Sequence, residues 1–321
     1  MSNQFRLNAQ ERKIVGLAAL GGMLEFYDFI IYGMFSVYFA HQFFPSNNQL
    51  LSIIESYVVF VLGYLSRPIG GMLFSHIGDE HGRKKVLIIT IILMGISSLG
   101  IGLLPTYQQI GVIAPIGLVV FRLLQGLALG GELPSTYVYI SESMPNKRGS
   151  GFGITMVGVN SGLLLGSLIN QLLNFAFTPA ELTSYGWRIP FILGGVICLI
   201  SYKIRQTLHE TAAFQRIEDK PEFPLGFLFK HHLPQMIAGI ATTAIMSGLV
   251  VVAIIFMPTY LHNILKVENR TISLIMTFAM LSNVLMIYIL GKVANTTSPY
   301  LILRNLLIAS VILIPFSYWL I

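Results

Sequence analysis

Long apolar runs separated by short polar segments are the main pattern along the chain. The hydrocarbon core of a bilayer is about 30 Å thick, and a helix of roughly 20 apolar residues crosses it. Nine runs of about this size lie near residues 14–40, 51–76, 86–105, 112–141, 151–177, 188–204, 234–262, 271–293 and 300–321. We therefore predict an all-α integral membrane protein in which each run is a transmembrane helix. The first run is too long for the apolar part of a signal peptide and contains Glu25 and Asp28, so we expect it to be retained.

The predicted helices fall into two groups. Residues 1–204 hold six of them, and residues 234–321 hold three. Residues 205–233 are more polar and include two prolines, which disfavour a further span. We expect a six-helix N-terminal half, a cytoplasmic connecting loop and a partial, three-helix C-terminal half.

Composition and charge support this interpretation and set the orientation. Charged residues make up 11% of the chain, against about 25% in soluble domains. Of the 20 Lys and Arg residues, 14 lie in loops on the side of the N-terminus, Arg205 among them, and only Lys266 and Arg270 lie in the opposite loops. The positive-inside rule then makes the N-terminus cytoplasmic, and we expect a multi-pass protein of the inner membrane. Topology thus accounts for the net charge of +6, and we predict no nucleic-acid partner, no cofactor and, with one cysteine, no disulfide framework.

Ionisable residues inside the predicted spans are the first functional candidates. An ionised side chain at mid-bilayer costs about 2.5–3.5 kcal/mol on insertion scales, so it needs a partner or a purpose. In the first span Glu25, Asp28 and Tyr32 are spaced three and four apart, which places them on one helix face. Two carboxyls this close could hold and release a proton near neutral pH, which suits a proton site. The alternative interpretation is an internal salt bridge or polar contact without a transport role.

The fourth span carries a fixed cation and a titratable acid, Arg122 and Glu132, roughly three turns apart. Small residues at 126, 128, 130 and 131 would let another helix approach closely. A Gly-Gly pair precedes a glutamate in both the first and the fourth span, as inverted three-helix repeats would place it. Glycine is common in such helices, so chance explains the pair equally well.

The short loop after the second span combines acidic, basic and histidine residues. Asp79 can pair with Arg83, four residues later, or cap a helix N-terminus. The acidic and histidine residues at 76–81 match no spacing of a metal motif, and the basic run beside them repels cations. We therefore predict no metal site and no catalytic residues.

Four short motifs stand at the ends of the predicted spans or within them. They are Gly78-Asp79 with Gly82-Arg83-Lys84-Lys85 after the second span, Arg122, Gln125 and Gly126 in the fourth, Glu142-Ser143-Met144-Pro145-Asn146-Lys147-Arg148-Gly149 after the fourth, and Gly186-Trp187-Arg188-Ile189-Pro190-Phe191 at the start of the sixth. Taken together, they resemble motifs of the major facilitator superfamily. With Glu25-Phe26-Tyr27-Asp28-Phe29 and Gly130-Gly131-Glu132, the chain is similar to the metabolite:H+ symporters, which include carriers of proline and betaine, 2-oxoglutarate and shikimate. The resemblance implies a helical bundle that alternates access to a central cavity, and proton-coupled symport of a small polar metabolite.

The resemblance and the charges inside the spans together suggest two groups of functional residues. The candidates for proton and substrate binding are Glu25, Asp28, Tyr32, Arg122, Gln125 and Glu132. The candidates for a conformational latch at the cytoplasmic face are Gly78, Asp79, Gly82, Arg83, Lys84, Glu142 and Arg148. Acidic groups on the first helix with Arg122 on the fourth could hold both ends of a zwitterion, which favours an amino acid or betaine over a dicarboxylate.

Two alternative functions remain open from the sequence. Members of the superfamily have twelve helices, so we expect this chain to be truncated after the ninth, and it could then be a non-transporting remnant or a subunit of a carrier. A membrane-embedded transferase would need a nucleophile with a base, or a metal set. The chain contains no Gly-x-Ser-x-Gly elbow and no second histidine at metalloprotease spacing from His209-Glu210, so this alternative is poorly supported.

Overall fold

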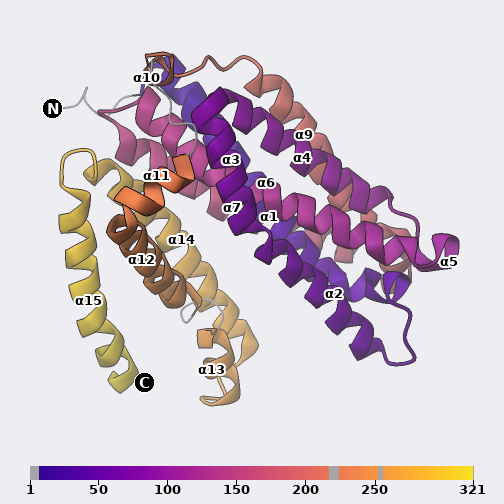
Figure 1. Ribbon diagram of the computed structural model, residues 1–321. Helices are drawn as coiled ribbons and strands as arrows, with labels where there is room; N and C mark the ends of the chain where they lie inside the picture. The colour runs from indigo at the N-terminus through magenta and orange to yellow at the C-terminus, as the bar shows by residue number, and fades with distance from the viewer. Residues whose placement is uncertain (1–6, 217–223, 252–255, 321) are drawn as a thin grey trace. The chain divides into compact units, whose positions relative to one another are not determined.

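The computed structural model describes residues 7–216, 224–251 and 256–320 (Figure 1). These described residues form helices joined by short connections, with no strand. They belong to two compact units, one made of Met1–Glu218 and Tyr288–Ile321 and the other of Asp219–Ile287. The predicted all-α fold class is confirmed.

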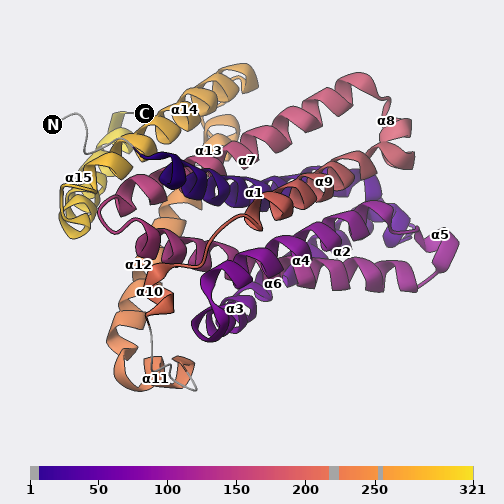
Figure 2. The ribbon, with the colours of Figure 1, turned by 90° about the horizontal axis from the view of Figure 1, so that it is seen from above.

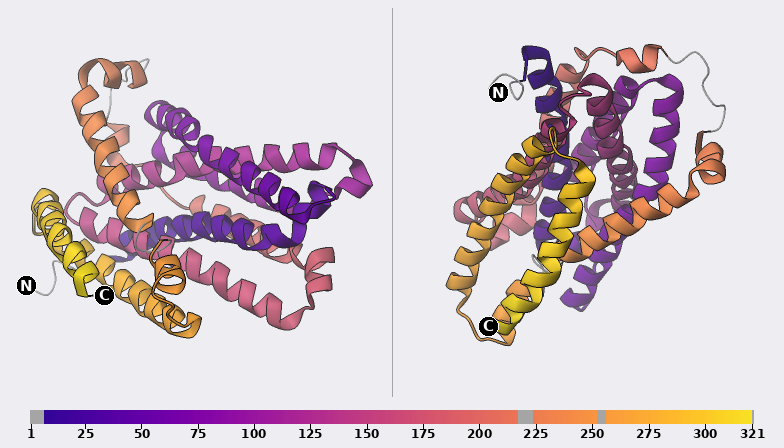
Figure 3. Two further views of the ribbon diagram at one scale, coloured as in Figure 1. Left: turned by 90° about the horizontal axis from the view of Figure 1, so that it is seen from below. Right: turned by 90° about the vertical axis from the view of Figure 1, so that its left-hand side faces the viewer.

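The helices of the two units have the following bounds. The first unit contains α1 (Ala9–Phe43), α2 (Gln49–Leu65), α3 (Arg67–His81), α4 (Arg83–Leu103), α5 (Tyr107–Ile110), α6 (Ile113–Ser143), α7 (Arg148–Ala176), α8 (Pro179–Glu181), the π-helix η1 (Leu182–Gly186), α9 (Arg188–Arg205), α10 (Ala212–Gln215) and α15 (Pro299–Leu320). The second contains α11 (Pro224–His231), α12 (Leu233–Val251), α13 (Met257–Asn263) and most of α14 (Asn269–Val293). In Figure 3 the orange helix that follows the short α11 is α12.

The lengths of the helices agree with most of the predicted spans. Within the described residues, six helical spans are long and apolar enough to cross a membrane, with α2 and α3 counted together as one. A seventh is formed if Pro179–Gly186 (α8 with η1) and α9, bent by 45°, are taken as one span. These seven coincide with the predicted spans in residues 1–204 and near 271–293. The predicted span near 300–321 falls on α15. The predicted span near 234–262 includes α12 and α13, and residues 252–255 of it lie outside the described residues.

Helix α1 lies at the centre of the first unit. It contacts α2, α6, α7 and α9, and Figure 2 shows it running beside α7 and α9. Its start is fixed by a capping box, in which the Glu11 main-chain N–H donates to Asn8 Oδ1 and the Asn8 N–H donates to Glu11 Oε2, each at 2.7 Å. Lys147 Nζ, between α6 and α7, also donates to Glu11 Oε2 at 2.8 Å. These contacts hold the N-terminal end of α1 against the connection between α6 and α7.

At the other end of α1, aromatic side chains form the largest apolar cluster. Phe35, Phe39 and Phe43 of α1 are fully buried and pack with Trp187 and Phe191 at the start of α9. Aromatic side chains thus fill this part of the bundle interior. The buried carboxyls of α1, Glu25 and Asp28, lie nearer the middle of the helix.

Glycines let α6 approach the α2–α3 pair to backbone contact. A Cβ atom added at Gly126 would overlap the Gly63 carbonyl, and one added at Gly130 would overlap the Arg67 carbonyl. The close approach predicted from the small residues of the fourth span is therefore confirmed, and its partner is the α2–α3 span. Close contact of this kind is what holds helices together in lipid, where the hydrophobic effect does not drive their association.

We expect opposite effects of alanine at two glycines. Gly126→Ala should destabilise the bundle by about 1–3 kcal/mol, because the new methyl group has no room against Gly63. Gly16→Ala on α1 should be neutral or stabilising by up to about 1 kcal/mol, because nothing lies within 4 Å of the new Cβ. Unfolding of the purified variants in a detergent titration measures both. Equal effects of the two changes would contradict the packing argument.

Candidate functional site

The residues predicted to share one face of the first helix do so, and that face is buried. Glu25 and Asp28 are each 2% exposed, and Tyr32 is fully buried. The Tyr32 hydroxyl donates to the Ser56 carbonyl on α2 at 3.1 Å. Tyr32 is therefore already hydrogen-bonded within the bundle, and the two carboxyls are the groups whose environments decide the chemistry of the site.

Asp28 is joined to Arg122 through the side chain of Gln125. Gln125 Nε2 donates to Asp28 Oδ2 at 2.6 Å, and Arg122 Nη1 donates to Gln125 Oε1 at 2.8 Å. Ser98 on α4 also donates its hydroxyl to Asp28 Oδ2. The guanidinium of Arg122 stacks over the Tyr32 ring at 4.1 Å and lies 5.1 Å from the Phe60 ring centre. An acid and a permanent cation are thus held within one buried network, bridged by a neutral amide that accepts from one and donates to the other.

Glu25 faces a different cation, Arg67 at the start of α3. The closest atoms, Arg67 Nη1 and Glu25 Oε1, are 3.9 Å apart, so the pair is an ion pair without a hydrogen bond. Arg67 also stacks on the Tyr64 ring at 4.1 Å. The sequence placed Arg67 in a span without assigning it a partner, because its neighbour lies on another helix.

Glu132 has the most complete set of partners of the three buried acids. Arg205 Nη2 lies 2.5 Å from Glu132 Oε1, and Arg205 Nη1 lies 3.0 Å from Glu132 Oε2. The two side chains thus form a bidentate salt bridge. Thr90 on α4 donates its hydroxyl to Oε2. Arg205, which the sequence assigned to the connecting loop, is instead the last residue of α9 and is 1% exposed. Its charge therefore contributes to the interior of the bundle.

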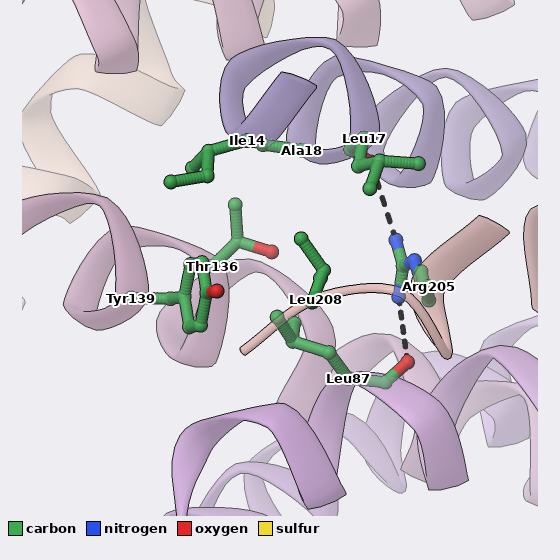
Figure 4. Close-up of a pocket in the computed structure, with 8 residues that line it drawn as sticks. All are labelled: Ile14, Leu17, Ala18, Leu87, Thr136, Tyr139, Arg205 and Leu208. Carbon is green, nitrogen blue, oxygen red and sulfur yellow. Dashed lines mark hydrogen bonds between the residues drawn. The ribbon is translucent and has the colours of Figure 1, made fainter. Parts of the chain in front are cut away.

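Arg205 is also held by main-chain carbonyls on two further helices. It donates to the Leu87 carbonyl at 2.7 Å and to the Leu17 carbonyl at 3.5 Å (Figure 4). The small cavity beside it measures about 10 Å³, which is room for about one water molecule. Gly21 on α1 lies so close that a Cβ there would overlap both Arg205 and Glu132. This cluster joins α1, α4, α6 and α9 and has no room for a metabolite.

Six of the predicted latch residues, all except Arg148, meet in one network. Arg83 Nη1 lies 2.5 Å from Asp79 Oδ1, so the expected Asp79–Arg83 pair is confirmed. Arg83 Nε donates to Glu142 Oε1 at 3.4 Å, and the Thr211 hydroxyl donates to Glu142 Oε2 at 2.5 Å. Gly78 packs against the same arginine, with 3.2 Å between an added Cβ and Arg83 Nη1. The network connects α3, α4 and α6 with the segment that follows α9.

Glu210 completes this network, a role that the sequence pattern did not predict. Its Oε2 accepts from the main-chain N–H of Lys84 at 3.1 Å, in the first turn of α4. Gly82 has φ +105°, a backbone conformation that favours glycine, and a Cβ there would also overlap the Glu210 carboxylate. Arg148, the last of the predicted latch residues, is the first residue of α7. Glu210 and Lys84 are 126 positions apart, so only the tertiary structure brings them together.

The structure therefore defines a multi-span, all-helical membrane protein with charged networks in its interior, as carriers of polar solutes have. The family model of the Major Facilitator Superfamily matches residues 18–321, and the chain belongs to this superfamily. The double-tryptophan variant of XylE has a similar fold, with a TM-score of 0.62 and 18% identity over 85% of this chain and 67% of that one.

Two relatives at higher identity carry names that refer to different metabolites. A Staphylococcus aureus (strain COL) protein named for proline/betaine transport is 34% identical over 290 residues, covering 88% of this chain and 62% of the relative. The alpha-ketoglutarate permease of Escherichia coli (strain K12) is 41% identical over 200 residues, covering 62% of this chain and 46% of the relative. The chain thus spans less than two thirds of the length of these relatives.

Proposed function

We propose that this chain functions in proton-coupled symport of a small polar metabolite across the inner membrane, with its N-terminus in the cytoplasm. The observation that carries the proposal is the buried connection from Asp28 through Gln125 to Arg122. When Asp28 is ionised, Arg122 balances its charge. When Asp28 takes up a proton, Arg122 loses that counter-charge, so the state of the proton changes the electrostatic balance at the centre of the bundle.

Coupling needs a second element with two arrangements that this balance can bias. We propose that the cluster of Asp79, Arg83 and Glu142, completed by Glu210, is that element. It joins three helices to the segment after α9, so opening the cytoplasmic face requires its contacts to separate. The protonation of Asp28 would bias this opening through α4 and α6, which carry partners of both clusters.

For the substrate we favour an amino acid or betaine over a dicarboxylate. The two relatives described above are named for these two classes, so similarity alone does not decide between them. Among the described residues of the spans, the buried network contains acids on α1 as well as cations, and a dicarboxylate would require more cations than acids.

Uptake by the reconstituted chain tests the proposal. Liposomes with an alkaline interior should accumulate labelled L-proline or glycine betaine, and an uncoupler should abolish the accumulation. For one proton per neutral substrate, each pH unit of gradient supports about a tenfold concentration ratio. Protein-free liposomes are the control. Uptake that ignores the gradient would refute proton coupling, and absence of uptake of any tested metabolite, 2-oxoglutarate included, would favour a non-transporting product.

A further inference from the structure

The three buried acids of α1 and α6 differ in how completely they are bonded. Glu132 is bonded at both oxygens by Arg205, and Asp28 accepts from Ser98 and Gln125 at one oxygen. Glu25 has only the loose contact with Arg67, and its Oε2 has no hydrogen-bond partner among the described residues. Glu25 is therefore a 98% buried carboxyl with unused hydrogen-bonding capacity.

Arg67 is the cation that faces Glu25, and its side chain is partly accessible to a ligand. Its side chain is 23% exposed, and its Nε also has no partner in the described part of the chain. The close contact of its main-chain carbonyl with Gly130 fixes the backbone of Arg67 against α6. The guanidinium is thus carried by a rigid position, stacks on Tyr64 and lies 3.9 Å from Glu25.

A pair that is buried but only loosely bonded costs free energy that a ligand can recover. Charges taken out of water are compensated only when good geometry satisfies their remaining donors and acceptors. The other central cation, Arg122, also has an Nε without a partner among the described residues, but it is only 5% exposed, donates to Gln125 and is stacked on Tyr32, so it is less accessible to a ligand than Arg67. The greater accessibility of Arg67 makes it the better candidate for holding a ligand carboxylate, and the part predicted for Arg122 in substrate binding stays a prediction.

We propose that Arg67 and Glu25 form the binding pair for a small zwitterion, with the ligand carboxylate on Arg67 and its ammonium group on Glu25. This inference rests on the proposed transport function and specifies its substrate class. In an α-amino acid or betaine the two charges are roughly 3 Å apart by ordinary bond lengths, comparable to the 3.9 Å between the charged groups of the pair. Such a ligand aligns antiparallel to the pair and balances both charges. An amino acid can also donate a hydrogen bond to Glu25 Oε2, whereas a betaine, whose nitrogen carries no N–H, balances the charge alone. A dicarboxylate would place a second anion beside Glu25, so the pair also rejects it.

Three ligands of similar shape separate the two contacts. Glycine betaine carries both charges, choline lacks the carboxylate, and 3,3-dimethylbutanoate lacks the positive charge. For the purified 321-residue chain in detergent, we expect glycine betaine to bind at least about tenfold more tightly than either analogue. Competition against labelled glycine betaine, or against labelled L-proline, gives the three affinities.

The substitutions should change the affinities in a crossed pattern. Arg67→Gln should lower the affinity for glycine betaine and should not weaken choline binding, because it removes a like charge beside the choline cation. Glu25→Gln should also lower the affinity for glycine betaine and should not weaken binding of 3,3-dimethylbutanoate, for the corresponding reason. Arg67→Lys keeps the charge and should keep part of the preference for glycine betaine over choline. Arg12→Gln, at an exposed position, and Glu55→Gln on α2 are matched controls that should change none of the three affinities.

The pattern distinguishes this inference from a structural role and from the transport proposal. Equal loss of all three ligands in a folded Arg67→Gln or Glu25→Gln variant would overturn the inference. Binding of 2-oxoglutarate by the unchanged chain, without binding of either zwitterion, would overturn it too and leave metabolite transport standing. A crossed pattern with no proton-driven uptake would support the binding pair and count against the proposed function.

Discussion

Asp28→Asn should abolish proton-driven accumulation while leaving substrate exchange intact. Asparagine has the shape of aspartate and can still accept at the oxygen that Ser98 and Gln125 contact, so the bundle should fold. It cannot take up or release a proton, so the pH gradient no longer does work on the substrate. Accumulation should fall from about tenfold per pH unit to a concentration ratio of about one. Exchange of external labelled substrate for internal unlabelled substrate moves no net proton and should continue.

The control for this prediction is Glu55→Gln, which removes a carboxyl from the neighbouring α2 at a position without a part in the Asp28 network. It should leave both accumulation and exchange unchanged. Asp28→Asn liposomes that still accumulate substrate in response to the gradient would assign proton coupling to another group. Loss of exchange together with accumulation would instead mean that Asp28 is needed for substrate binding.

Hydrophobic runs predicted most of the fold because the bilayer imposes a simple length requirement on each helix. The helices that cross in residues 1–204 follow the predicted spans, with ends that differ by several residues. The predicted close approach at Gly126 and Gly130 was also confirmed, because only small residues allow helix backbones to touch. Which helix would make that approach could not be predicted, since the glycine pattern is a property of one surface and not of its partner.

The residues of the candidate site could be predicted from the sequence, but the contacts that each of them makes could not. Glu25, Asp28, Arg122 and Glu132 stood out because charged groups are costly in a span, and Gln125 stood out through the resemblance of its motif to the family's. Their partners lie on other helices, and Ser98 and Thr90 are small polar residues that no charge pattern distinguishes. A local signal such as the four-residue spacing of Asp79 and Arg83 did lead to a correct pair.

Arg205 shows why counting charges by position along the sequence has a limit. The positive-inside rule treats a basic residue at the end of an apolar run as a loop residue. Lys203 and Arg205 are both in the last turn of α9, but residues two apart point to different sides of a helix. Lys203 is exposed, whereas Arg205 points into the bundle and meets Glu132. The topology drawn from the remaining basic residues does not depend on this one.

This buried pair leads to the largest expected effect on stability. Arg205→Met should destabilise the bundle by about 3–5 kcal/mol, because it leaves the Glu132 carboxylate buried without its cation and releases two main-chain carbonyls. The Arg205→Met, Glu132→Leu double variant should recover most of the loss, because an apolar pair of similar volume removes the unbalanced charge. Unfolding in a detergent titration measures both, with Arg12→Met at an exposed position as the control.

The double variant also decides whether Glu132 takes part in transport. If Glu132 serves only to hold α6 against α9, the stable double variant should accumulate substrate in response to a pH gradient as the unchanged chain does. This outcome is expected because Arg205 and Thr90 occupy both oxygens of Glu132, beside a cavity of about 10 Å³. A double variant that folds to full stability and yet fails to accumulate substrate would restore Glu132 to the proton pathway, with Asp28 as its partner in coupling.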